Sequence, residues 1–210
     1  MARIYKGIDL SHWNRVLSWK EIAAGNDFVI LKAGGGDYSY NFIDPKFEEY
    51  YSRCKMYKIP VGAYYYCPKN MLTPEAGLFA AQCFLQLLKD KKFEMPVFLD
   101  IENTPKNKKK EATDAAISFC RFLEKNRHFV GIYSSDISGF KERLQIERLS
   151  DFTLWVARYG KEPTYTRNYG LWQYSSTGEV PGIYGKVDMD YSYKNYPKII
   201  KGGRFNGYNS

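Results

Sequence analysis

The sequence predicts an α/β fold of one domain, a trimmed version of the eight-stranded β/α (TIM-like) barrel. Eight short runs rich in β-branched and aromatic residues indicate strands, and helix-like segments separate the first six of them. Parallel strands need a crossover connection, usually a helix, so this alternation favours parallel pairing. Only about a dozen residues, rich in Gly, Pro, Thr and Ser, separate each of the last three runs. We therefore predict five β/α units followed by three strands without helices, which suits 210 residues because a complete barrel has about 250.

The first four expected strands include the most apolar runs. Residues 4–9 (IYKGID) open the series and end in an acid. Residues 28–33 (FVILKA) are almost continuously apolar, as expected of a strand buried on both faces. Residues 61–66 (VGAYYY) end in three tyrosines, and residues 96–102 (PVFLDIE) end in two acids. Polar residues therefore accumulate where these strands end.

The last four expected strands are shorter or more polar. Residues 129–133 (FVGIY) and 152–157 (FTLWVA) still follow helix-like segments. Residues 169–174 (YGLWQY) and 187–191 (VDMDY) follow turn-rich segments instead. In a closed barrel the last strand neighbours the first, so these eight runs are enough to complete the ring.

Five helices are expected in the gaps, at residues 18–24, 43–58, 73–89, 110–126 and 136–149. The third has a clear start signal, because Thr73 is a capping residue and Pro74 stands at the first helical position. The basic run 106–110 (KNKKK) is expected as a solvated loop that leads into the fourth helix.

Residues 1–197 are expected to form a single catalytic domain, since no internal repeat or Pro/Ser-rich linker interrupts them. Residues 198–210 (KIIKGGRFNGYNS) are expected as a basic tail or linker stub. The N-terminus has no apolar stretch typical of a signal peptide, and no run has membrane-spanning length. We therefore expect no membrane insertion and a route of release other than a signal peptide, and we expect a monomer.

Composition indicates an ordinary globular chain with an unusual number of rings. Hydrophobic residues make up 44%, charged residues 26% and aromatic residues 17%, including 19 Tyr. Rings with a polar edge suit a wet groove that holds an amphipathic ligand, although a Tyr-rich core would also use them. A net charge of +8 attracts polyanions, among them nucleic acid, anionic lipid and bacterial cell wall.

The cysteines and histidines do not form a metal-binding pattern. Cys54, Cys67, Cys83 and Cys120 lack the close pairs of a zinc site, and two histidines, at 12 and 128, add no ligand spacing. We expect reduced thiols, which fits folding in a cytoplasm. No metal and no cofactor are expected.

Acidic side chains gather at the strand ends. Asp100 and Glu102 are two apart on one strand, so they share a face, with Cβ atoms about 6 to 7 Å apart at about 3.3 Å per residue. Two carboxyls this close cannot both ionise freely, so one stays protonated, as a glycosidase proton donor must. The alternative is a strand that simply ends in solvent with two exposed acids.

The first and last strands add further acids. Asp9 ends the first strand and Asp188 lies on the last, so both are expected at the same rim as Asp100 and Glu102. Asp190 shares parity with Asp188 and is a candidate substrate-binding residue. Together these acids predict an acidic cleft in a basic protein.

Aromatic residues flank the same rim, and their flat rings suit the C–H faces of pyranose sugars. They are Trp13, Tyr64, Tyr66, Tyr133, Trp155, Trp172 and Tyr174. We expect about half of them to belong to the core. Tyr64 and Trp172 are the preferred sugar contacts, and Tyr66 and Tyr133 are further substrate-binding candidates.

The ordered motifs resemble glycoside hydrolase family 25, the Chalaropsis-type lysozymes found as bacterial autolysins and phage endolysins. The matching pieces run in family order from GIDLSHW, FVILKAG and VGAYYY to VFLDIE, LWVARY, LWQYSSTG and GKVDMDY, and they cover residues 4–193. The resemblance implies a trimmed β/α barrel that hydrolyses the β-1,4 bond between N-acetylmuramic acid and N-acetylglucosamine in peptidoglycan. It also implies action on the cell wall, outside the cell or after release from a host cytoplasm at lysis.

The resemblance also implies roles for particular residues. Glu102 matches the proton donor and Asp100 its partner acid, while Asp9 and Asp188 match acids on neighbouring strands. Tyr64 matches an active-site tyrosine. His12 departs from the family pattern, and no wall-binding repeat follows the motifs.

Two mechanisms are compatible with these acids. In one, the substrate's 2-acetamido group attacks while Asp100 orients it; such substrate-assisted routes are known exceptions to the two-carboxylate scheme. In the other, Asp9 or Asp188 acts as base or nucleophile across the cleft.

Three rival functions would each leave a different mark in the sequence. A chitinase-like glycosidase would carry a longer acidic series on the fourth strand. A lectin-like pseudoenzyme would have lost an acid. Nucleic-acid binding rests on charge alone, and an acidic cleft opposes it, so we expect no nucleic-acid partner.

Overall fold

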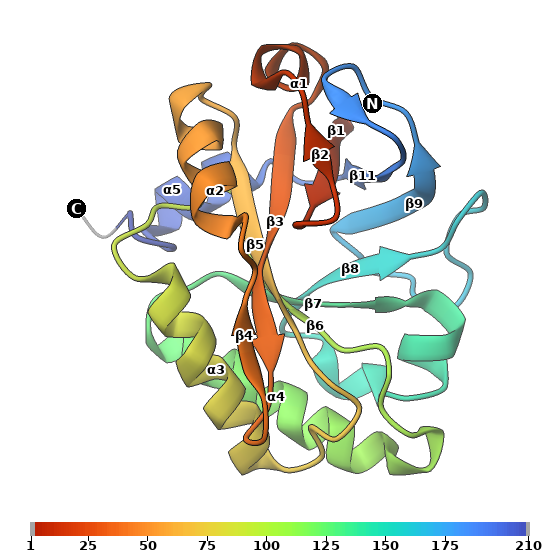
Figure 1. Cartoon of the computed structure of the whole chain (residues 1–210). Coiled ribbons are helices and arrows are strands. Elements are labelled where there is room, and N and C mark those ends of the chain that lie inside the picture. Colours follow the sequence, from red (N-terminus) through yellow and green to blue (C-terminus); the bar gives the residue numbers. More distant parts are fainter. Residues whose placement is uncertain (1–2, 209–210) are drawn as a thin grey trace.

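The computed structural model describes residues 3–208, and its core is a closed, mixed barrel of eight strands (Figure 1). The strands are β1 (Tyr5–Leu10), β3 (Phe28–Gly36), β5 (Val61–Tyr66), β6 (Val97–Asp100), β7 (Val130–Ser135), β8 (Thr153–Ala157), β9 (Leu171–Gly178) and β11 (Val187–Ser192). The spatial order is β1-β11-β9-β8-β7-β6-β5-β3, and pairing of β1 with β3 closes the ring. The predicted fold class is therefore confirmed.

Strand β11 is the one strand of this ring that runs against its neighbours. It pairs antiparallel with both β1 and β9, whereas the other neighbouring pairs in the ring are parallel. The start of β11 therefore lies at the rim where the parallel strands end. This reversal needs only the short connection that the turn-rich sequence provides.

Four helices cover the parallel part of the barrel, as Figure 1 shows. They are α1 (Trp19–Gly25), α2 (Phe47–Met56), α3 (Pro74–Leu88) and α4 (Lys109–Lys125). Thr73 caps α3 as predicted, with its side chain accepting a hydrogen bond from the backbone N–H of Ala76. The second helix begins later than expected because residues Asn41–Ile43 form strand β4, which extends β3 as a hairpin.

The expected fifth helix, at residues 136–149, is not continuous. The segment forms a π-helical turn, η2 (Asp136–Lys141), and a 3₁₀ turn, η3 (Ile146–Leu149). The carboxylate of Asp136 accepts hydrogen bonds from the backbone N–H groups of residues 164–166, outside the segment. Gly139 is also a poor helix former, and a Cβ there would lie 2.0 Å from the hydroxyl oxygen of Ser134. Tertiary contacts therefore override the helical pattern.

The structure differs from the expected tail at residues 198–208. A fifth α-helix, α5 (Tyr196–Gly203), places fully buried Ile200 in the barrel interior, and Asn206 is buried beyond it. The side chain of Asn206 accepts from the backbone N–H of Phe129 (2.8 Å) and donates to the carbonyl of Met95 (3.0 Å). These contacts close the bottom of the barrel, a role that the local sequence pattern does not reveal. Residues 209 and 210 lie outside the described residues.

Several short elements complete the chain. Strands β2 (Arg15–Val16) and β10 (Ile183–Tyr184) pair as a small ribbon, and η1 (Lys106–Lys108) leads into α4. Lys106, Lys108 and Lys110 of this basic run are exposed and form ion pairs with nearby acids, whereas Lys109 is half-buried and donates to the carbonyl of Lys141. The four cysteines are free thiols. Within residues 3–208, no helix is both long and apolar enough to cross a bilayer.

Alternation along the strands divides the core into two layers. On β3, Phe28 and Ile30 belong to the cluster inside the barrel, whereas Val29 and Leu31 pack outward against the helices. Each strand therefore sends every second residue inward. At the carboxyl ends of the parallel strands these inward positions become polar, which places the functional groups at one rim.

Candidate active site

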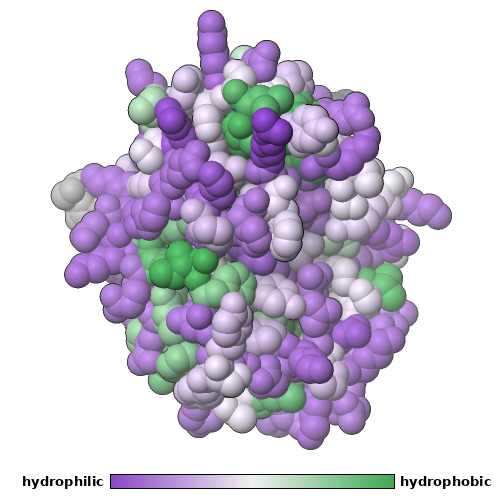
Figure 2. Space-filling view, in the orientation of Figure 1, coloured by the Kyte–Doolittle hydropathy of each residue, from purple (hydrophilic) through white to green (hydrophobic). Residues whose placement is uncertain are grey.

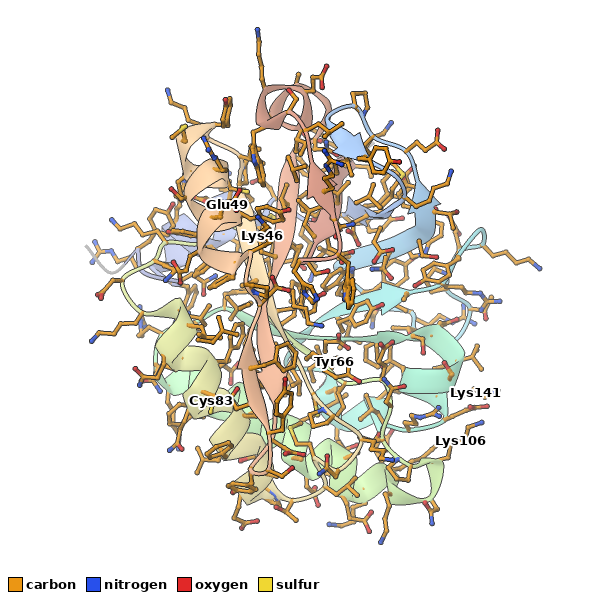
Figure 3. The ribbon with its side chains drawn as sticks, viewed as in Figure 1. Lys46, Glu49, Tyr66, Cys83, Lys106 and Lys141 are labelled. Carbon is orange, nitrogen blue, oxygen red and sulfur yellow. The ribbon has the colours of Figure 1, made fainter. Side chains whose placement is uncertain are left out.

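A cavity of about 260 Å³ opens at the rim where the parallel strands end. Its lining residues are Asp9, Lys32, Tyr64, Tyr66, Asp100, Glu102, Tyr133, Trp155, Tyr159, Gln173 and Asp188. The four acids that the sequence analysis placed at one rim therefore meet in one cavity. Tyr66 lies near the centre of the face drawn in Figure 3.

Asp100 and Glu102 both face the cavity, one at the end of β6 and the other just beyond it. Asp100 ends the strand and is only 6% exposed, whereas Glu102 lies two residues further on and is half-buried. Burial raises the pKa of Asp100 well above its ordinary value; the neighbouring Glu102 adds to this, and Lys32 opposes it. Both acids therefore tend to keep a proton, because the pKa of Glu102 is also raised, by burial and then by Asp188.

Asp9 and Asp188 face each other across the seam between the first and last strands. They are paired residues in the β1–β11 ladder. Asp9 is buried, and one of its oxygens accepts a hydrogen bond from Nε2 of Gln173 at 2.7 Å. Burial and then the charge of Asp188 raise the pKa of Asp9, while the Gln173 hydrogen bond opposes the rise. Burial also raises the pKa of Asp188.

Lys32 is a cationic member of the site that the sequence analysis missed. It continues the inward series of Phe28 and Ile30 on β3, and its Nζ lies 5.0 Å from the centre of the Tyr66 ring. Its charge favours the ionised forms of Asp100 and Glu102. A lysine inside an otherwise apolar strand was the signal that could have identified it.

Gln173 was also missed, together with Tyr159. The hydroxyls of Tyr133 and Tyr159 both donate to Oε1 of Gln173, at 2.9 Å and 3.1 Å. These two hydrogen bonds fix the orientation of the Gln173 amide, so that its Nε2 points toward Asp9. Gln173 is 2% exposed, so its hydrogen bonds orient a buried acid as well as bordering the cavity.

The predicted aromatic contacts divide into two groups. Tyr64, Tyr66, Tyr133 and Trp155 line the cavity. Trp172 does not; its Nε1 donates to the carbonyl of Arg158 (2.8 Å), and its ring packs outward. Because neighbouring residues on a strand face opposite sides, the inward position on β9 belongs to Gln173, and the preference for Trp172 as a sugar contact is corrected.

The other two flanking rings also lie outside the cavity lining. Tyr174 stacks on Tyr191 with ring centres 4.2 Å apart. Trp13 is 81% exposed and packs on His12 at 4.4 Å. His12 in turn places Nδ1 2.7 Å from the carboxylate of Asp44, which also accepts the backbone N–H of His12. His12 therefore anchors the loop after β1.

Asp190 occupies a different place from the one expected of a substrate-binding residue. It is fully buried, is absent from the cavity lining, and accepts a hydrogen bond from Nε1 of Trp155 at 2.7 Å. Asp190 does share the inward side with Asp188, because Met189 between them packs outward. Strand β11 runs antiparallel to its neighbours, so Asp190 lies deeper in the barrel than Asp188 and below the cavity. The parity argument therefore holds for the side that Asp190 faces, but it does not indicate how deep the residue lies.

The fold agrees with comparisons to known proteins. The chain is 28% identical over 204 residues to lysozyme M1 of Streptomyces globisporus, a match that covers 88% of this chain and 66% of that protein. The chain is 28% identical in sequence to the CTP1L endolysin. Its superposition on the crystal structure of that endolysin covers 94% of this chain and 70% of the endolysin chain, with a TM-score of 0.81. The spore cortex lytic enzyme SleM of Clostridium perfringens is 26% identical, with a TM-score of 0.76 and coverages of 91% and 68%.

A family model gives the same result over most of the sequence. The family described as "Glycosyl hydrolases family 25" matches residues 8–183, a span that includes Asp9, Asp100 and Glu102. The chain belongs to this family and is a glycoside hydrolase.

Proposed function

We propose that this glycoside hydrolase is a lysozyme that cleaves the β-1,4 bond between N-acetylmuramic acid and N-acetylglucosamine in peptidoglycan. The observation that carries the proposal is the placement of Glu102, a half-buried carboxyl in an acid-lined cavity where burial and Asp188 raise its pKa. The similarity to a lysozyme, an endolysin and a spore cortex lytic enzyme supports peptidoglycan as the substrate.

Glu102 acts as the general acid. Its proton moves to the glycosidic oxygen while the bond from that oxygen to the anomeric carbon breaks, so the leaving sugar departs as a neutral alcohol. Positive charge develops at the anomeric carbon and the ring oxygen. Asp9 on β1 and Asp188 on β11 lie across the cavity from Glu102. Their ionised carboxylates stabilise that charge in a cavity shielded from bulk water.

Asp100 orients the substrate's 2-acetamido group. Its Oδ1 is buried and has no hydrogen-bond partner within residues 3–208, although the residue borders the cavity. A bound acetamido N–H would satisfy this oxygen and turn the acetamido oxygen toward the anomeric carbon. Water then attacks the resulting cyclic intermediate and loses its proton to the ionised Glu102, which restores the acid.

The net charge of the protein favours binding to the bacterial cell wall. A net charge of +8 suits an anionic wall, and Figure 2 shows a mostly hydrophilic face with separate apolar patches. We propose that the protein acts at the cell wall as a monomer.

Analysis of the cleavage products tests the bond assignment. Purified wall is digested, reduced with borohydride and hydrolysed, and the amino sugars are separated. Muramitol is the expected product, because a muramidase leaves N-acetylmuramic acid at the new reducing end. Glucosaminitol as the main product would reassign the bond to a glucosaminidase. New amino termini without new reducing ends would mean that the enzyme is not a glycosidase acting on this wall.

A further inference from the structure

Asp190 lies beneath the cavity and has no exposed surface. Its Oδ1 accepts the indole N–H of Trp155 at 2.7 Å, and its Oδ2 has no hydrogen-bond donor within the described part of the chain. Its carboxyl group lies within reach of that of Asp9, because Asp190 is the diagonal neighbour of Asp9 in the β1–β11 ladder and pairs with Gln173, which bonds Asp9. Two carboxyl groups can share a hydrogen bond only if one of them holds a proton, since an ionised carboxylate only accepts.

The surroundings decide which of the two holds it. Asp9 borders the cavity and already receives the amide N–H of Gln173, whose orientation the hydroxyls of Tyr133 and Tyr159 fix. Asp190 is fully enclosed, and its second oxygen receives no N–H from the described residues. Apart from the shared proton, each carboxyl has one N–H donor, so enclosure distinguishes them. A carboxylate with no exposed surface costs more than one that borders a polar cavity. The proton therefore belongs on Asp190.

We propose that Asp190 is a positioning residue that stays a neutral carboxylic acid and donates a hydrogen bond to Asp9. Asp9 is thereby held as a carboxylate between two donors, Asp190 and Gln173, and aimed at the sugar. This inference rests on the proposed function, because the carboxylate of Asp9 stabilises the positive charge at the anomeric carbon.

The charges around Asp190 favour the neutral form. Asp9 on β1 and Asp188 on β11 are acids, and Tyr174 on β9 is neutral at working pH. Burial and then Asp9 raise the pKa of Asp190; the Trp155 hydrogen bond opposes the rise, and Asp188 adds to it. Ionisation of Asp190 would place two negative charges in contact, so it is expected to remain protonated over the working range of pH.

Paired substitutions of Asp190 test the proposal. Asp190→Asn keeps the shape, with an amide N–H for Asp9 and an oxygen for Trp155, so it should retain most of the rate. Asp190→Leu has similar size but can make neither bond. Its kcat should fall by about 10- to 100-fold, the range for one hydrogen bond to a charged group, with a smaller change in KM. Asp190→Asn should keep the limbs of the wild-type pH–rate profile, whereas Asp190→Leu should move the acid limb to higher pH, because Asp9 loses a donor that lowers its pKa.

A spectroscopic measurement tests the protonation of Asp190 without relying on catalytic turnover. At neutral pH, the infrared carbonyl band of protonated carboxylic acids should lose the intensity of one such group in Asp190→Asn, while the contribution of other protonated acids such as Glu102 remains. The exposed Asp151→Asn (61% exposed side chain) is the matched control and should keep the band and the rate.

Three outcomes would overturn the proposal. They are an Asn variant as slow as the Leu variant, an unchanged infrared band, or wild-type kcat in both variants with only their melting temperatures lowered. The last would mean a purely structural role. Each of these requires a wild-type enzyme that releases reducing ends from wall, so a wild-type enzyme that releases none would instead contradict the proposed function.

Discussion

The carboxyl groups of Asp100 and Glu102 differ in exposure although only one residue separates them. Asp100 ends β6 and is 6% exposed, whereas Glu102 lies beyond the strand and is half-buried. A proton donor must reach the glycosidic oxygen, and a residue beyond the end of the strand can do so more readily than one enclosed within it. The difference favours Glu102 as the donor and Asp100 as the orienting group.

Replacing Glu102 by Gln removes the proton without changing the shape of the side chain. Glu102→Gln should keep the fold and lose about 10²- to 10⁴-fold of the rate of reducing-end release, the usual contribution of general acid catalysis. Glu48→Gln, at a side chain that is 66% exposed, is the matched control and should keep the wild-type rate. A Glu102→Gln enzyme with full activity would exclude Glu102 as the donor.

Asp188 is the carboxylate that adds most to the raised pKa of Glu102, a contribution that the sequence analysis assigned to Asp100. Asp188→Asn removes this negative charge, so the pKa of Glu102 should fall. Because Glu102 must be protonated to act, the alkaline limb of kcat/KM should then move to lower pH. The position of the limb is the readout, since Asp188 also borders the cavity. A limb that stays in place would mean that Asp188 does not act on Glu102.

At the scale of strands and helices, the sequence predicts what local periodicity controls. All eight strands of the ring and four of the helices fall close to their expected places. The acids at strand ends follow from the inward alternation of β6 and from the position of β1 in the ring. These features depend on residues close in sequence, which is why a pattern reveals them.

Features set by distant contacts could not be predicted in this way. Choosing Gln173 over Trp172 requires the register of β9, and placing Asp190 below the cavity requires the antiparallel direction of β11. Helix α5 is short and basic. Its structural role is to bury Ile200 and to position Asn206 under the barrel. The segment after Asp136 looks helical, but its acid binds a loop some thirty residues away.

Helix α3 packs against α4 without room for a side chain at Gly77. A Cβ there would lie 2.0 Å from the carbonyl oxygen of Ala115. Gly77→Ala should therefore push the helices apart and lower the free energy of unfolding by about 1 to 3 kcal/mol, measured by urea denaturation.

Gly25, the last residue of α1, is the matched control, because a Cβ there meets nothing within 4 Å. Gly25→Ala should be neutral or stabilise by up to about 1 kcal/mol. Equal effects of the two substitutions would contradict close packing at Gly77.

For the molecule as a whole, the active site is a local excess of negative charge in a chain of net charge +8. Burial raises the pKa of Asp100 and Asp190, so the folded protein holds protons that the unfolded chain releases at about pH 4. Stability supplied by these groups is present below that pH and declines as pH rises through the raised pKa values. Asp136 acts in the opposite sense: backbone hydrogen bonds and Arg158 lower its pKa to about 2, so its contribution is lost between about pH 4 and 2.

Asp100→Asn should remove part of the decline in the free energy of unfolding that accompanies a rise in pH toward neutral. The variant should gain stability relative to the wild type as pH rises from about 4 to about 7, even though its activity falls. Urea denaturation across this range measures the difference, and Asp151→Asn serves as an exposed control. A difference between variant and wild type that does not change with pH would show that the carboxyl of Asp100 does not carry a raised pKa.

The seam between β1 and β11 joins the beginning of the described chain to its end. Asp9 is synthesised with the first strand of the barrel, but its partner Asp188 follows only with the last strand, and Asn206 closes the barrel later still. During synthesis on the ribosome, no earlier length of chain contains a complete cavity. A cell that makes this enzyme is therefore not exposed to its hydrolytic activity through unfinished copies, because the acids come together only when nearly the whole described sequence has emerged.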